Sequence, residues 1–395
     1  MPAELILKPG REKSVRRCHP WIFSGAVDRL DGRPEPGETV AVLTSQGEPL
    51  GWAAFSPQSQ IRARMWSWDP AETIDERFFQ RYISQAIRRR AALFPDHPLQ
   101  AVRLCHAESD GLPGVVVDRY ADWLVVQWLT AGAERWKDVI LEMLIAETGI
   151  QQVYERSDVE VRRLEGLDER TGLVSGDLPE RVCIEENGLR FRVDFVHGQK
   201  TGFYLDQRRN RMRVRDLAAG RRVLNCFCYS GAFSLYAYAG GASEILSIDS
   251  SAEALILAQE NASLNEMDSK LLTWQEADIF HALRRLRDQG QHFDMVILDP
   301  PKFAPTAAQA ERAARGYKDI NLLGFKLLNP GGLLFTYSCS GGISAEFFQK
   351  IVAEAALDAR VEAVVIEHLS QDADHPVALN FPEGAYLKGL VCQVG

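Results

Sequence analysis

The sequence has few cysteines and no long apolar run, and each shortage excludes a class of protein. No stretch approaches the roughly 18 consecutive apolar residues of a membrane-spanning helix. The start, Met1-Pro2-Ala3-Glu4-Leu5, lacks the basic, apolar and small-residue order of a signal peptide. Seven cysteines in 395 residues fit reduced thiols better than a disulfide framework. We therefore expect a cytoplasmic protein with no membrane partner.

Signatures of metal and dinucleotide binding are also missing. Cys226 and Cys228 form the closest cysteine couple, but no His or Cys pair at zinc spacing accompanies them, so no metal site is expected. The loop around them reads Asn225-Cys226-Phe227-Cys228-Tyr229-Ser230-Gly231 and has one glycine. A dinucleotide pyrophosphate needs close backbone approach at the missing glycines, so NAD and FAD are disfavoured. A nucleoside cofactor without phosphates tolerates such a loop.

The net charge of -9 argues against a nucleic-acid partner, because affinity for phosphate backbones comes mainly from Lys and Arg. The distribution of the basic residues weakens that objection. Two runs concentrate them: Lys8, Arg11, Lys13, Arg16 and Arg17, and then Arg208, Arg209, Arg211, Arg213 and Arg215. Each run is typical of either a solvated face or an RNA contact.

The length predicts two or three domains, since it exceeds what one hydrophobic core usually serves. Residues 1–72 contain short strand-like runs at 40–43, 50–55 and 61–66, separated by turns, which indicates a small β-barrel. The segment Gly10 to Ser24 is basic and ends in His19-Pro20-Trp21-Ile22-Phe23-Ser24. It resembles the opening of a PUA domain, a small RNA-binding barrel, although its aromatic residues are equally typical of a core.

Residues 73–185 predict a central α+β domain. Helical periodicity runs over 75–93 and 136–147, and a hairpin is expected between 115–120 and 123–128. Residues 186–395 instead alternate strand, loop and helix. Strands are expected at 223–225, 244–248, 271–274, 295–298 and 333–336, with helices that include 232–239, 252–264 and 307–328. This α/β alternation predicts a parallel, doubly wound, Rossmann-like sheet.

Reactive side chains follow these expected strands. Asp249, Asp278 and Asp299 each come after an apolar run, and Cys339 follows the next one. Open α/β sheets bind ligands outside the carboxyl ends of their strands, so these groups are expected at one edge. Asp249 is placed to bond a ribose hydroxyl pair, although a carboxylate ending a strand is common in any α/β protein. Asp299 and Cys339 together outline a reaction centre.

These motifs carry a resemblance to a known family. The ordered set of 227–231, Asp249, Asp278 and Asp299-Pro300-Pro301-Lys302 resembles the motifs of class I S-adenosylmethionine-dependent RNA methyltransferases. The segment Lys200 to Arg208 resembles an extra cofactor motif found before the first strand in one branch. With the PUA-like start, the resemblance covers nearly the whole chain. It points to the bacterial 23S ribosomal RNA cytosine-C5 methyltransferases of the large subunit methyltransferase I type.

The resemblance implies S-adenosylmethionine as the cofactor and 23S ribosomal RNA, naked or in a ribosomal particle, as the partner. It implies that Asp249 holds the ribose and that the adenine lies near Asp278. The implied cofactor-binding residues are Phe203, Tyr204, Asp206, Gln207, Asn225, Phe227, Tyr229, Ser230, Gly231, Asp249, Ser250, Asp278, Ile279 and Asp299. The candidate RNA contacts are Lys8, Arg11, Lys13, Arg16, Arg17 and Lys302. A homodimer is left open.

Carbon 5 of cytosine is a poor nucleophile, so this chemistry needs a group that activates the ring. A thiolate that adds to carbon 6 makes carbon 5 enamine-like and able to attack a sulfonium methyl group. Cys339 is the candidate nucleophile, and Asp299 is the candidate for bonding the N3 and amine edge as charge develops. The site should therefore lower the pKa of Cys339 or supply a base.

Other interpretations stay open. Many cytosine-C5 RNA methyltransferases carry a second cysteine where this chain has Pro301-Lys302, so the base that removes the C5 proton is unassigned. A lone cysteine at a strand end is often a small buried hydrophobe. The alternatives are a methyltransferase of the same fold that acts on another base or atom, a non-catalytic RNA-binding protein and, least favoured, a dehydrogenase.

Overall fold

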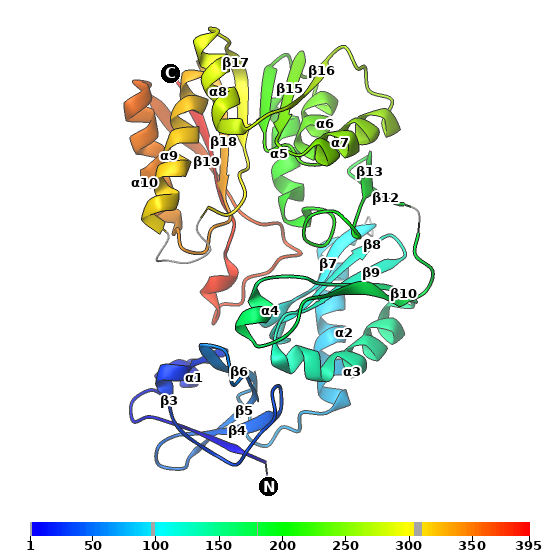
Figure 1. Ribbon diagram of the computed structural model, residues 1–395, viewed down its shortest axis with the longest axis vertical. Helices are drawn as coiled ribbons and strands as arrows, with labels where there is room; N and C mark the ends of the chain where they lie inside the picture. Colours follow the sequence, from blue (N-terminus) through cyan, green and yellow to red (C-terminus); the bar gives the residue numbers. More distant parts are fainter. Residues whose placement is uncertain (1, 96–98, 180, 304–309) are drawn as a thin grey trace. The chain divides into compact units, whose positions relative to one another are not determined.

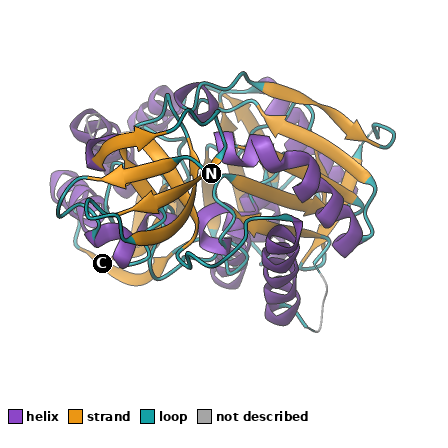
Figure 2. Cartoon of the chain, turned by 90° about the horizontal axis from the view of Figure 1, so that it is seen from below, coloured by secondary structure: helices purple, strands orange, loops and turns teal. Residues whose placement is uncertain are grey.

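The computed structural model describes residues 2–95, 99–179, 181–303 and 310–395. The chain forms two compact units (Figure 1). The first consists of Met1–Ile184, Val193–Leu205 and Ala373–Gly384, and the second of Glu185–Arg192, Asp206–Asp372 and Ala385–Gly395. The division into domains at 72/73 and 185/186 stays a prediction. Helices and strands occur throughout both units (Figure 2).

The N-terminal part of the first unit is a mixed sheet over an apolar core. Its elements are β1 (Glu4–Leu7), α1 (Lys13–Arg16), β2 (Trp21–Phe23), β3 (Val27–Asp31), β4 (Thr39–Leu43), β5 (Pro49–Phe55) and β6 (Ile61–Ser67). The strand order is β2-β6-β5-β4-β1-β3, and β1 pairs with β4 in parallel. The strands bury alternate side chains, among them Leu5, Val40 and Met65, as expected for strands with one face on a core.

The rest of the first unit is built mainly on a second sheet, with order β11-β10-β9-β8-β7. Its elements are α2 (Glu76–Leu93), β7 (Ala101–His106), β8 (Val115–Tyr120), β9 (Trp123–Trp128), α3 (Ala131–Thr148), β10 (Gln152–Ser157), α4 (Val161–Leu164) and β11 (Arg170–Ser175). The expected helices and hairpin are present. α3 begins before its expected start because the Thr130 hydroxyl accepts a hydrogen bond from the Ala133 N–H, at 3.2 Å. Trp66 of β6 packs in the same core as α2, so the two sheets share apolar contacts.

The second unit contains the Rossmann-like sheet. Its elements are η3 (Leu205–Gln207, a 3₁₀ turn that begins at the unit boundary), α5 (Arg208–Leu217), β14 (Arg222–Cys226), α6 (Ala232–Ala239), β15 (Glu244–Asp249), α7 (Ala252–Leu264), β16 (Leu272–Glu276), α8 (Ile279–Asp288), β17 (Phe293–Leu298), α9 (Ala310–Lys326), β18 (Leu328–Ser338), α10 (Ala345–Ala359), β19 (Ala363–Leu369) and β20 (Lys388–Val394). A separate hairpin, β12 (Val182–Glu186) and β13 (Leu189–Val193), precedes them. The start of the helix expected over 307–328 lies outside the described residues.

The sheet order is β16-β15-β14-β17-β18-β20-β19. Helix α6 contacts α5 and α7, and helix α9 contacts α8 and α10; the two groups cover opposite faces of the sheet (Figure 1). The doubly wound prediction is confirmed, and the five expected strands, β14 through β18, pair in parallel. The sequence did not predict β20, which is antiparallel to both β18 and β19. No α-helix lies between β19 and β20 in the chain, so β20 returns in the opposite direction.

The parallel strands end together at one edge. Cys226 pairs with Ile248 on one side and with Leu298 on the other, and Leu298 pairs with Thr336. Their apolar residues are buried on both faces, as parallel strands in this fold usually are. No helix in the described ranges combines the length and the apolar composition that crossing a bilayer requires.

Candidate active site at the carboxyl edge of the sheet

The predicted site residues of the second unit gather at the carboxyl edge of the parallel strands. The 227–231 loop follows β14, Asp249 ends β15, Asp278 follows β16, Asp299 follows β17 and Cys339 follows β18. The strand order brings these five positions side by side in the sequence β16, β15, β14, β17, β18. This is the edge at which α/β sheets bind their ligands.

The loop after β14 has an unusual backbone. Phe227 and Tyr229 have φ values of 60° and 46°, in the left-handed region that costs a non-glycine residue about 1–3 kcal/mol. Gly231 also has a positive φ, and an added Cβ there would lie 2.9 Å from the Ala258 Cβ. Such conformations persist where the surrounding structure enforces them, and they concentrate at ligand sites. Cys226 and Cys228 are buried, and burial raises the pKa of both thiols, so they act as packing residues.

Asp249 is tied to this loop. Its Oδ2 accepts the Tyr229 N–H at 2.8 Å, and its Oδ1 accepts the Ser251 N–H at 3.0 Å. An ionised carboxylate has about four acceptor positions, so about two remain for a ligand, and the side chain is half-exposed. An oriented carboxylate with free lone pairs fits the hydroxyl pair of a ribose. Ser250, the next residue, is exposed.

Of the two predicted site residues after β16, one is exposed and the other is buried. The Asp278 carboxylate caps α8 by accepting the His281 N–H at 2.9 Å, and the residue is exposed. Ile279 is buried in the core of the second unit. Helix capping alone accounts for an aspartate at this position. The predicted adenine contacts of Asp278 and Ile279 stay predictions.

Asn225 and Ser230 are fully or almost fully buried. The Asn225 amide donates to the Ser234 hydroxyl at 2.8 Å, while its Oδ1 is buried without a hydrogen-bond partner among the described residues. A buried acceptor without a partner is costly and is usually satisfied by a ligand or water. Asn225 therefore fits a donor group such as the amine of a nucleoside cofactor.

The segment predicted to precede the first strand lies partly in each unit. In the first unit, the Phe203 carbonyl accepts from the Tyr120 hydroxyl at 3.2 Å, and the Tyr204 hydroxyl donates to the Gln199 side chain at 2.8 Å. In the second unit, the Asp206 carboxylate accepts from the Tyr386 hydroxyl at 2.6 Å. Their predicted cofactor contacts stay predictions.

Gln207 has a role that the sequence did not indicate. Its buried side-chain amide donates to Oδ2 of Asp299 at 3.0 Å, so it sets the direction of that carboxyl group. Asn210 in turn donates to the Gln207 Oε1 at 2.5 Å. Asp299 itself is half-buried. Burial, and then the nearby Asp299 charge, raise the pKa of Tyr337 on β18 well above its ordinary value.

Cys339 is half-buried at the end of β18. The next residue, Ser340, is buried and holds two groups: the Tyr317 hydroxyl lies 2.9 Å from its Oγ, and the Lys388 amine donates to its carbonyl at 2.7 Å. Neither Tyr317 nor Lys388 was among the predicted site residues. The one available signal for Lys388 is a basic residue at the start of an otherwise apolar strand.

The N-terminal basic run is on the surface. Lys8, Arg11, Lys13, Arg16 and Arg17 are all exposed, and Arg16 forms an ion pair with Glu48. A hollow of about 430 Å³ is lined by Arg11, Lys13, Trp21 and Phe23, together with Gly10, Ser14, Val15, Ile22, Gly25 and Ala26. Phe23 is 50% exposed, which is unusual for a large aromatic side chain that merely fills a core. Lys302, the other predicted RNA contact, is also exposed.

The second basic run is not a solvated face. Arg208 and Arg211 of α5 are buried and form ion pairs with Glu186. Arg213 pairs with Glu367, and Arg215 donates to the Asn187 carbonyl. Arg209 is the exposed one of the five arginines, and it forms no ion pair with the described residues. These arginines therefore attach α5 to neighbouring elements of the second unit.

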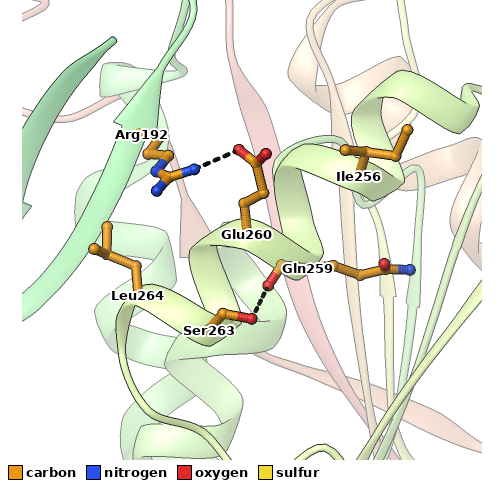
Figure 3. A pocket seen from close by; sticks show the side chains of 6 residues that line it. All are labelled: Arg192, Ile256, Gln259, Glu260, Ser263 and Leu264. Carbon is orange, nitrogen blue, oxygen red and sulfur yellow. Dashed lines mark hydrogen bonds and ion pairs between the residues drawn. The ribbon is translucent and has the colours of Figure 1, made fainter.

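A shallow depression of about 460 Å³ lies on α7 rather than at the strand ends (Figure 3). It is lined by Arg192, Ile256, Gln259, Glu260, Ser263 and Leu264. An ion pair of 2.9 Å joins Arg192 to Glu260, and the Ser263 hydroxyl donates to the Gln259 carbonyl within the helix (Figure 3). None of its lining residues is a predicted site residue.

Comparison with known proteins agrees with this geometry. Residues 139–389 match the S-adenosylmethionine-dependent methyltransferase family, and residues 5–68 match the PUA-like domain. The chain is 50% identical over 396 residues to ribosomal RNA large subunit methyltransferase I of Shewanella frigidimarina, with 100% of both proteins covered. It is 52% identical over 393 residues to the protein of that name from Aeromonas hydrophila, with 99% of each covered.

A solved SAM-dependent methyltransferase from Streptococcus mutans has the same fold, with a TM-score of 0.85 at 22% identity over 99% of this chain and 100% of that one. The predicted α/β fold with a PUA-like N-terminal domain is confirmed, and so is the cofactor, S-adenosylmethionine. The chain belongs to the ribosomal RNA large subunit methyltransferase I family of S-adenosylmethionine-dependent methyltransferases.

Proposed function

We propose that this protein transfers a methyl group from S-adenosylmethionine to carbon 5 of a cytosine in 23S ribosomal RNA. The observation that carries the proposal is the pairing of β17 with β18, since Asp299 and Cys339 follow these adjacent strands. The ribosomal RNA substrate rests on the name of relatives that are about half identical over their full length. The choice of cytosine C5 rests on the carboxyl and thiol chemistry.

In this proposal Cys339 activates the base. Its thiolate bonds to carbon 6, and the electron pair of the C5–C6 double bond becomes available at carbon 5. The Asp299 carboxyl group, held by Gln207, hydrogen-bonds the N3 and amine edge while charge develops there. When bound, S-adenosylmethionine supplies the electrophilic methyl group. Loss of the C5 proton to a base not yet assigned then expels Cys339 as a thiolate.

The cofactor would be held by Asp249 at the ribose and by the 227–231 loop beside it. Asn225 would accept from the amino group of the methionine part through its unpartnered Oδ1. The remaining predicted contacts, among them Asp206, Tyr229 and Asp278, complete the proposed set. Asp206, Tyr229 and Asp278 lie in the second unit, on segments that follow the strands or directly precede α5. Phe203 and Tyr204, also in the predicted set, belong to the first unit.

The RNA would also be bound by the N-terminal part of the chain, away from Asp299 and Cys339. The hollow beside Arg11 and Lys13 offers two cations and the exposed ring of Phe23, a combination that suits phosphate contact and base stacking. The target base must leave its stack to reach a thiol at a strand end. A cytoplasmic location follows from a ribosomal RNA substrate and stays a prediction, as does a homodimer.

The decisive experiment is substitution of Cys339 by Ala. RNA from a strain that lacks this gene and labelled S-adenosylmethionine should give methyl transfer with the native protein. We expect the variant to lose at least about 10³-fold in rate, since a covalent route disappears with its nucleophile. Cys183→Ala, which removes an exposed cysteine elsewhere in the chain, is the control and should keep the native rate.

Two further readouts identify the base and the bond. Nucleoside digestion and mass measurement should show 5-methylcytidine, and RNA that carries 5-fluorocytosine should trap a covalent complex with native protein but not with Cys339→Ala. Undiminished transfer by Cys339→Ala would favour a methyltransferase acting on another base or atom. Tight RNA binding with no transfer by the native protein would favour the non-catalytic alternative.

A further inference from the structure

The last strand of the sheet brings an amine beside Cys339. β20 lies antiparallel to β18, and in this pairing Lys388 is opposite Ser338. The Lys388 Nζ donates to the carbonyl oxygen of Ser340 at 2.7 Å. The side chain therefore starts opposite Ser338 and ends at the backbone of Ser340, the two residues that flank Cys339.

The surroundings of Lys388 do not provide the usual counter-ion. In the part of the chain that the structure describes, no carboxylate forms an ion pair with Lys388, which is half-buried. The groups that act on its charge are Cys339 after β18 and Lys302 after β17. Tyr317 of α9 lies at Ser340, and Asp299 follows the neighbouring strand β17. Of the two groups that act on the Lys388 charge, Cys339 is the acidic one.

The pKa of Lys388 is far below that of an ordinary lysine. Burial lowers the pKa of Lys388 to about 8, with an opposing contribution from Cys339 and a further lowering by Lys302. An ordinary cysteine has a pKa of about 8.5. A lysine with an ordinary pKa of about 10.4 would hold its proton permanently. With its pKa lowered to about 8, the Lys388 amine can instead take up a proton at a pH near that value.

We propose that Lys388 is a positioning residue for Cys339: its amine takes the proton of the thiol and stays beside the sulfur as the cation that stabilises the thiolate. The inference rests on the proposed function, because it supplies the nucleophile which that function requires. One S–H bond breaks and one N–H bond forms, so a neutral pair becomes an ion pair without any other reactant. Cys339 leaves carbon 6 as a thiolate, so the Lys388 ammonium can form the same ion pair with it after each turnover.

This role predicts the direction of a pH effect. An adjacent cation favours the charged form of a thiol, so it lowers the pH at which Cys339 becomes a thiolate. Removal of the cation should raise that pH. An opposite charge within about 4–6 Å typically shifts a pKa by about 1–3 units. Replacement of Lys388 by Met should therefore raise the midpoint for Cys339 by about 1–2 pH units.

The test measures alkylation of the full-length protein by iodoacetamide as a function of pH, with the peptide that contains Cys339 quantified by mass spectrometry. The midpoint should rise in Lys388→Met and stay low in Lys388→Arg, which keeps the charge. Lys302→Met, which removes the neighbouring exposed lysine, is the matched control and should move the midpoint by less than about 0.5 units. An equal rise in both Met variants, or no rise in Lys388→Met, would overturn the proposal.

A reciprocal measurement covers the case in which Lys388→Met fails to fold. Coupled groups affect one another equally, so Cys339→Ala should lower the pKa of Lys388. Competitive labelling of Lys388 with acetic anhydride over pH 6–10 (a range of about two units on either side of the native value) would report it. An unchanged Lys388 midpoint in that variant would contradict the inference.

The role of Lys388 and the proposed methyl transfer can be refuted separately. Both labelling experiments use the resting protein and need no RNA or cofactor. Undiminished methyl transfer by Cys339→Ala would refute the nucleophile and leave the Lys388 shift measurable. Loss of transfer in Cys339→Ala, together with a pH midpoint of Cys339 alkylation that is the same in native protein and Lys388→Met, would refute only this inference.

Discussion

Asp299 shows how one side chain depends on another that is distant in sequence. The motif that contains Asp299 predicts a carboxyl group at the strand end, but nothing in it specifies where the oxygens point. That direction comes from Gln207 in η3, which is itself held by Asn210. Because both amides are buried, this chain of hydrogen bonds is protected from water and is rigid.

Substitution of Asp299 by Asn should separate catalysis from cofactor binding. The variant keeps the shape but replaces the carboxyl group by an amide that cannot release a proton to N3, so we expect the rate of methyl transfer to fall by about 10²–10³-fold. The dissociation constant for S-adenosylmethionine, measured by calorimetry, should change by less than about threefold, or about 0.7 kcal/mol. Gln207→Leu should give a smaller loss of rate. A fall in cofactor affinity that matches the fall in rate would assign Asp299 to the cofactor instead.

At the scale of the element, α5 shows why a charge run read from sequence can mislead. The five arginines predict a solvated or RNA-binding surface, yet Arg208 and Arg211 point into the unit. Glu186, at the end of β12, forms ion pairs with both guanidinium groups, and it accepts hydrogen bonds from Arg211 and, at 2.9 Å, from the Tyr236 hydroxyl. Its carboxylate is fully buried. Periodicity cannot show that this partner exists, since Glu186 lies on a separate hairpin.

Replacement of Glu186 by Leu should therefore destabilise the protein strongly. The substitution leaves Arg211 buried without its carboxylate partner, and loss of one member of a buried ion pair typically costs about 3–5 kcal/mol. Urea unfolding followed by circular dichroism would measure the change. Glu362→Gln, at an exposed position, is the control and should alter the free energy of unfolding by less than about 0.5 kcal/mol. A loss below about 1 kcal/mol for Glu186→Leu would mean that the site relaxes and admits water.

The regular elements of the second unit were predictable from the sequence. Helices α6 and α7 have the expected bounds, and the expected strands correspond to β14 through β18. Apolar runs between polar loops carry that information. The antiparallel direction of β20 and its insertion between β18 and β19 were not predictable, because neighbouring strands are chosen by packing across the sheet.

At the scale of the whole molecule, charge is unevenly distributed. The chain carries a net charge of -9, while the exposed residues Arg11 and Lys13 line one hollow. A negative protein that binds RNA must do so through a local positive surface, because phosphate affinity depends on the cations in contact. The N-terminal hollow satisfies that requirement.

Charge reversal in the hollow should weaken RNA binding in a salt-dependent way. For Arg11→Glu with Lys13→Glu, we expect affinity for a 23S ribosomal RNA fragment to fall at least about tenfold and the slope of log K against log salt to shrink by about 1–2. Fluorescence anisotropy over a series of salt concentrations would measure both quantities. Arg33→Glu, which reverses an exposed charge outside the hollow, provides the comparison. Equal losses of RNA affinity in the double variant and in Arg33→Glu would indicate that net charge, and not a defined binding surface, controls RNA affinity.

The sequence by itself determined the Rossmann-like class of the second unit and the order of Asp249, Asp278, Asp299 and Cys339 along it. Those residues share an edge because every parallel strand ends on the same side of the sheet. Only the tertiary structure decided that Gln207 orients Asp299, that Lys388 reaches the residue after Cys339, and that Glu186 pairs with two arginines of α5. Local patterns report which face of an element is buried, whereas these contacts depend on which distant element packs against that face.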